Sequence, residues 1–84
     1  MAKANEHSRN LELLALQGIM SSKDGRSYIA RLLDVAGANL DTYSSDPYRH
    51  AYNAGKRSLG LWVKDEVSTH YPDLYLQMLK EENQ

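Results

Sequence analysis

The three histidines are the side chains best suited to metal binding or proton transfer, and their spacing supports neither. His7, His50 and His70 are far apart, and none belongs to the paired-histidine helix signature of zinc hydrolases. The chain has no cysteine, which removes thiolate metal sites and disulfides. We therefore predict no metal site and no cofactor.

Gly55-Lys56-Arg57-Ser58 has the residue types of a phosphate-binding loop without its context. The upstream glycine and the preceding strand are missing, and the segment falls inside a predicted helix. Serines are frequent, but none lies at a strand-turn-helix elbow that would expose a nucleophile. We expect a protein that is not an enzyme and has no small-molecule substrate.

A candidate basic face lies on the third predicted helix. Arg49, Lys56 and Lys64 are seven and eight residues apart, which aligns them along one side of a helix, with Asn53 and Arg57 adjoining. The face is either simply solvated or a contact for DNA or an acidic protein, and salt dependence separates these readings. The net charge of −1 argues against a dedicated nucleic-acid binder.

The elements that position these residues are all helical. Apolar periodicity predicts an all-α fold, a small bundle of about four helices in which the third is longest and central. With 84 residues the chain forms one domain, 1–84. We expect a flexible N-terminus over about residues 1–7 and helices at about 8–20, 24–36, 47–68 and 72–82.

Local signals set the ends of these helices. Ser22 or Asp24 is a candidate cap for the second helix, and Gly37 supplies its C-terminal stop. Asp46-Pro47 is the sharpest boundary, because aspartate caps free amides and proline fits the first helical position. Pro72 begins the fourth helix.

Periodicity also predicts which side chains face the core. In the second helix they are Tyr28, Ile29, Leu32, Leu33 and Ala36. In the third they are Tyr48, Tyr52, Gly55, Leu59, Trp62 or Val63, and Val67. In the fourth they are Leu74, Tyr75, Met78 and Leu79. The outer side of the second helix is expected to carry Arg26, Arg31 and Asp34, and a close approach of two backbones is expected at Ala51, Ala54, Gly55 and Ser58.

The first helix is apolar over an unusually wide surface, which means that it is either sandwiched in the core or offered to another chain. Tyrosines outside the core stripes are also candidate contacts, because tyrosine concentrates at interfaces. The predicted hydrophobic and aromatic partner contacts are Leu13, Leu16, Met20, Tyr43 and Tyr71.

Small size and the lack of disulfides favour support from a partner, because a chain of this length buries only about 60% of its unfolded surface. We expect self-association or docking on a larger assembly. The N-terminal residues are polar and no apolar run approaches the ~20 residues of a membrane helix. We therefore expect no signal peptide and no membrane span.

Several segments together form one pattern. It consists of Gly25-Arg26, Ile29-Ala30-Arg31-Leu32-Leu33, Ala36-Gly37, Ser44-Ser45-Asp46-Pro47-Tyr48, the run from Tyr52 to Trp62, and then Pro72, Tyr75, Met78 and Glu81. This pattern resembles a family of small tailed-bacteriophage proteins of the podophage type, encoded near the structural genes. It covers about residues 25–80 and leaves the first helix outside.

The resemblance implies a virion-associated or structural role, with other phage structural proteins or a second copy as partners. The virion or the cytoplasm of the infected host would be its location. Two alternatives stay open. One is a small phage protein that binds and inhibits a host enzyme or defence factor, and the other is an accessory protein with weak DNA contact.

Overall fold

The computed structural model describes residues 6–38 and 44–83 and contains four α-helices. The all-α prediction is confirmed, and the third helix is the longest, as predicted. The first helix starts before Ser8 and the third continues two residues beyond position 68. The helices are α1 (Glu6–Met20), α2 (Lys23–Ala36), α3 (Pro47–His70) and α4 (Pro72–Glu82).

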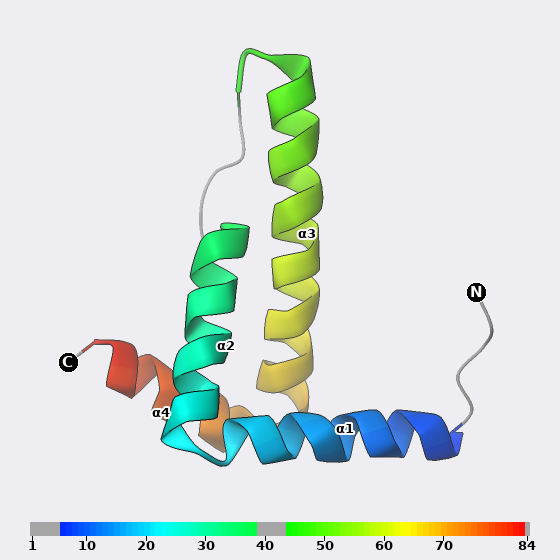
Figure 1. Ribbon diagram of the computed structural model, residues 1–84, viewed down its shortest axis with the longest axis vertical. Helices are drawn as coiled ribbons and strands as arrows, with labels where there is room; N and C mark the ends of the chain where they lie inside the picture. Colours follow the sequence, from blue (N-terminus) through cyan, green and yellow to red (C-terminus); the bar gives the residue numbers. More distant parts are fainter. Residues whose placement is uncertain (1–5, 39–43, 84) are drawn as a thin grey trace.

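The helices form a flat body shaped like an inverted T, with α2 and α3 upright and α1 and α4 extending to opposite sides at their lower ends (Figure 1). Helices α2 and α3 lie side by side and antiparallel, and α1 crosses their lower ends almost at right angles. Helix α4 packs against α2 and α3 at the same end, and α2 contacts each of the other three helices. The Cα extents are 41 × 41 × 17 Å, so the upper half of α3 stands clear of α1 and α4.

Side chains cap the helices where the sequence indicates. The Ser22 hydroxyl accepts a hydrogen bond from the Gly25 amide at 2.9 Å. Asp46 Oδ1 accepts from the Tyr48 amide at 3.0 Å, directly before Pro47 at the helix start. Gly37 ends α2 with φ of 72°, a left-handed conformation that favours glycine. These three predicted boundaries are confirmed.

The hydrophobic core is small and takes residues from all four helices. It lies at the lower end of the molecule, where α1, α3 and α4 meet α2. Partly buried apolar side chains, including Leu16, Val63 and Tyr75, pack around it. The buried members are Met20, Ile29, Leu33, Ala38, Val67 and Met78.

The close approach between backbones occurs at Gly60, and the prediction that placed it around Gly55 is wrong. A Cβ added at Gly60 would lie 2.7 Å from Ala36 Cβ and 3.3 Å from Ala38 Cβ. A Cβ at Gly55 would meet nothing within 4 Å. Helix α2 therefore packs on the side of α3 that carries Gly60 and Val67.

The core stripe predicted for α3 is correct only at its lower end. Val67 is fully buried and Val63 is half-buried. Gly55 and the other four members face solvent because α2 covers a different side of α3. The exposed members with large side chains are Tyr48 (88%), Tyr52 (68%), Leu59 (64%) and Trp62 (58%).

The predicted core side of α2 is also partly wrong. Tyr28 and Leu32 were predicted in the core and are exposed, whereas Arg26 was predicted outside and is 6% exposed. The side of α2 that meets α4 therefore includes Arg26, and the core side is rotated away from Tyr28. Leu79, predicted to face inward on α4, is 38% exposed.

Candidate functional site

A long exposed apolar surface runs along α3. It consists of Tyr48, Tyr52, Gly55, Leu59 and Trp62, at successive offsets of four, three, four and three residues. We call this set the α3 stripe. Residues at this spacing stay on one side of a helix, and large apolar side chains that cluster in solvent mark a binding surface.

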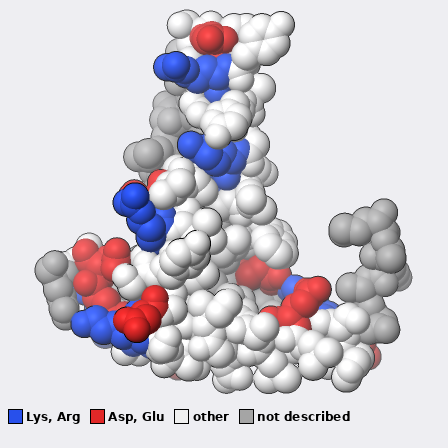
Figure 2. Space-filling view, viewed as in Figure 1, with Lys and Arg blue, Asp and Glu red and all other residues white. Residues whose placement is uncertain are grey.

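A cavity of about 700 Å³ opens where α1 crosses α2 and α3. We call it the corner cavity. Figure 2 shows a broad uncharged surface near this junction and a group of acidic and basic side chains in the angle between α3 and α1. Its charged lining residues are Arg9, Glu12 and Glu66. Its apolar lining residues are Leu13, Ala15, Leu16, Ile19, Ile29, Leu32, Trp62 and Val63.

Polar contacts hold α1 across the foot of α3 and so shape this cavity. Arg9 Nη2 donates to Glu66 Oε2 at 2.5 Å, and Arg9 Nη1 donates to Glu12 at 3.2 Å. The hydrogen bond from Arg9 lowers the pKa of Glu66. The Tyr71 hydroxyl donates to the Leu13 carbonyl at 2.5 Å. The Arg9–Glu66 and Tyr71–Leu13 hydrogen bonds each join residues more than fifty positions apart, so the sequence spacing does not reveal them.

The predicted partner contacts have four different outcomes. Leu13 and Leu16 line the corner cavity and are half-buried, so they stay candidates. Met20 is fully buried in the core, so its prediction as a partner contact is wrong. Tyr71 is half-buried and its hydroxyl is used within the chain. Tyr43 lies outside the described residues.

The predicted basic face is only partly open. Arg49 and Lys56 are exposed, and the Lys56 ammonium lies 5.4 Å from the centre of the Tyr52 ring. Asn53, Arg57 and Lys64 are half-buried, since they lie towards the side that α2 covers. The five residues therefore share a side of α3 without forming one fully exposed patch. Whether this surface contacts DNA or an acidic protein stays a prediction.

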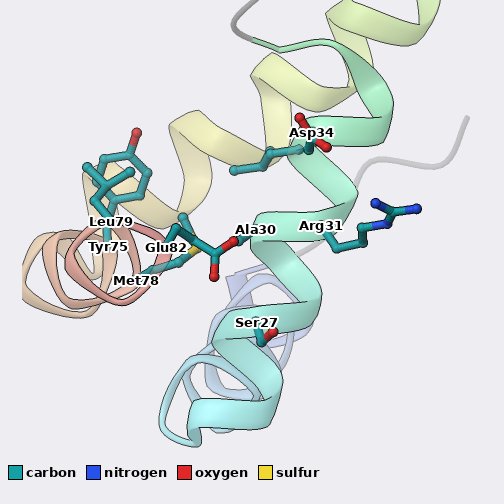
Figure 3. Close-up of a pocket in the computed structure, with 9 residues that line it drawn as sticks. Ser27, Ala30, Arg31, Asp34, Tyr75, Met78, Leu79 and Glu82 are labelled. Atoms are coloured by element: carbon teal, nitrogen blue, oxygen red, sulfur yellow. The ribbon is translucent and has the colours of Figure 1, made fainter. Parts of the chain in front are cut away.

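A second hollow of about 490 Å³ lies between α2 and α4 (Figure 3). In the close-up, Tyr75, Met78 and Leu79 come from α4, and the Arg31 side chain extends away from them. Asp34 and Glu82 contribute carboxylates from opposite helices. Within residues 6–38 and 44–83, no group of three or more His, Asp or Glu side chains is placed to hold a metal ion.

Arg26 and Glu81 form a buried link that the sequence did not reveal. Arg26 Nε and Nη2 donate to the two Glu81 carboxylate oxygens at 2.8 and 2.9 Å, and Nη1 donates to the Met20 carbonyl at 3.0 Å. The bidentate hydrogen bond from Arg26 lowers the pKa of Glu81. This contact joins α2 to α4 and to the end of α1, so it is a structural connection at the lower end of the molecule.

The geometry combines a long apolar stripe with an apolar cavity. Among the described helices, none is both long and apolar enough to cross a membrane.

A family model of Bbp19-like phage proteins matches residues 16–80. The match begins inside α1, so the resemblance reaches further towards the N-terminus than the motifs at residues 25–80 indicate. No curated protein and no solved structure gives a significant match.

Proposed function

Because the chain belongs to the Bbp19-like phage protein family, we propose that it is a non-catalytic helical adaptor of the phage particle or of its assembly. The observation that carries this proposal is the exposed apolar surface formed by the α3 stripe and the corner cavity. Recognition by shape and apolar contact is the activity that such a surface supports.

The extended shape of the molecule favours a protein that functions while bound to a larger assembly. Its Cα radius of gyration is 14.6 Å, whereas a compact chain of this length has about 12 Å. Leu59 and Trp62 are more than half exposed, and covering each of them stabilises a complex by roughly 1–3 kcal/mol. An apolar surface of this extent is stabilised by a partner.

Membership of a phage protein family supports phage structural proteins as the class of partner. We place the protein in the virion or in the cytoplasm of the infected host, with phage structural proteins as its neighbours. A gene position near the structural genes of a short-tailed phage is part of the same proposal. The described residues carry no arrangement of side chains that we assign to a reaction.

The test is the protein content of purified virions. Particles banded in a density gradient should contain the chain at a fixed number of copies per major capsid protein, as measured by quantitative mass spectrometry. Consistent absence from infectious particles and from assembly intermediates would contradict the proposal. Recovery of one stoichiometric host protein from uninfected lysate would instead favour the inhibitor alternative.

A matched pair of variants links incorporation to the proposed surface. Trp62 lines the corner cavity at 58% exposure, and Leu76 lies on α4 at 54% exposure. Trp62→Asp should lower the copies per virion at least tenfold, while Leu76→Asp should leave them unchanged. Equal incorporation of both variants would exclude the α3 side as the docking surface.

A further inference from the structure

We propose that a second copy of this chain covers the α3 stripe, so that two α3 helices pair antiparallel and Tyr48 of each copy enters the corner cavity of the other. The partner is the chain itself, which competes with a phage structural protein for the same surface, and the pairing does not depend on the phage role. Four features of the described residues lead to this arrangement: spacing, side-chain size, charge and the position of the cavity.

The spacing of the α3 stripe is that of a helix-pairing seam. Offsets of four and three residues repeat every 3.5 residues on average, which keeps the stripe facing a partner helix over its whole length. Helix α3 has 24 residues and is about 36 Å long. In the single chain the large side chains of the α3 stripe, the seam of the proposed pair, face solvent from Tyr48 at the upper end of α3 to Trp62 near its lower end.

Side-chain size favours the antiparallel orientation. In an antiparallel pair centred between Gly55 and Leu59, each Leu59 lies opposite the Gly55 of the other copy, and each Tyr52 lies opposite a Trp62. A Cβ at Gly55 would meet nothing within 4 Å of its own chain, so the space beside it is free for a leucine. A parallel pair would stack Gly55 on Gly55 and leave a void, which close packing disfavours.

Charge favours the same orientation. The upper half of α3 carries Arg49, Lys56 and Arg57 without an acidic residue. The lower half carries Asp65 and Glu66 together with a single lysine, Lys64, so it is acidic on balance. A parallel pair would bring the basic halves together. An antiparallel pair places each basic half beside an acidic half and opposes the two helix dipoles.

The corner cavity receives the upper end of the second helix. In the antiparallel register, Tyr48 of one copy comes level with Glu66 of the other, and Glu66 and Trp62 both line the cavity. Tyr48 is 88% exposed in the single chain. The pairing therefore covers an exposed aromatic ring with the apolar lining of the corner, twice per dimer.

The first experiment is sedimentation velocity of the full chain over a concentration series. The wild type should sediment as a dimer that dissociates on dilution. Leu59→Lys, on the seam at 64% exposure, should sediment as a monomer, and Leu76→Lys, off the seam at 54% exposure, should remain dimeric. Circular dichroism should show the same helical content for all three, because both positions are exposed.

Cysteine cross-linking tests the orientation, because the natural chain has no cysteine. Ser58 lies beside the centre of the antiparallel pair, so Ser58→Cys should form a disulfide-linked dimer under mild oxidation. The two copies of Tyr48 would be about 27 Å apart at 1.5 Å per residue, so Tyr48→Cys should not. Linkage through Tyr48→Cys but not through Ser58→Cys would overturn the antiparallel pairing.

Two further results would overturn the proposal. One is a wild-type monomer at concentrations up to about 1 mM, where even a weak pair associates. The other is a dimer that Leu59→Lys leaves intact, since this would place the contact on another face.

Discussion

The glycines of α3 provide a matched pair of alanine substitutions with opposite expected effects on stability. Both Gly55 and Gly60 lie inside the helix, where alanine is favoured over glycine by about 1 kcal/mol. At Gly55 the new methyl group meets nothing within 4 Å, so Gly55→Ala should raise the free energy of unfolding by up to about 1 kcal/mol.

At Gly60 the same methyl group collides with the neighbouring backbone region of α2. It would lie 2.7 Å from Ala36 Cβ, and that atom cannot rotate away because it is fixed to the main chain. Overpacking of this kind costs about 1–3 kcal/mol, which exceeds the propensity gain. Gly60→Ala should therefore lower the free energy of unfolding by up to about 2 kcal/mol, and should leave it about 1–3 kcal/mol below that of Gly55→Ala.

Urea denaturation followed by helical circular dichroism measures this difference. The protein should be dilute enough for self-association not to contribute, because Gly55 lies on the proposed seam. A Gly60→Ala variant as stable as Gly55→Ala would refute the close packing of α2 on α3 that defines this fold.

The remaining predictions concern the foot of the molecule. Gly25→Ala should destabilise the chain more than Gly60→Ala, since a Cβ there would overlap the Ile19 carbonyl, and its urea midpoint should be the lower of the two. Arg26→Ala should lower the urea midpoint clearly more than Arg31→Ala on the exposed side of the same helix, because it leaves the Glu81 carboxylate without its guanidinium partner; equal midpoints would contradict a structural role. The hydrogen bond from Arg26 lowers the pKa of Glu81, so this stabilisation is present above the unfolded glutamate pKa of about 4.3 and is lost as the pH falls through the lower folded value. Wild-type urea midpoints should therefore fall on acidification, and Glu81→Gln should show a shallower fall; an unchanged slope would contradict the assignment.

Local rules were sufficient for the helices and their ends. Ser22, Gly37 and Asp46-Pro47 each satisfy backbone groups within a few residues, so their effect is readable without knowledge of the fold. The apolar pattern likewise identified α3 as the longest helix. These features depend on short-range chemistry alone.

The orientation of the helices about their own axes could not be predicted in the same way. Periodicity shows that α3 has an apolar side, but it does not say whether that side meets the chain's own core or solvent. The small Gly60 allowed α2 to pack on a different side, and the stripe with Tyr48 and Trp62 stayed outside. The same residues that looked like core became the candidate site.

The ion pairs between distant parts of the chain were also beyond sequence reasoning. Arg26 contacts Glu81 and Arg9 contacts Glu66, with 55 and 57 positions between the partners. Arginine is more often exposed than buried, so the residue type predicted the outer surface for Arg26. Only the convergence of α1, α2 and α4 at one end brings these charges together.

The transverse direction of α1 determines how a pair of these subunits could connect to its surroundings. Each copy carries one short arm at right angles to its long helix (Figure 1), and twofold symmetry would place the two arms at opposite ends of the pair. Leu11 and Leu14 on each arm are more than half exposed. Such a pair is bivalent, and simultaneous attachment at both ends holds a weak connector far more firmly than either contact alone.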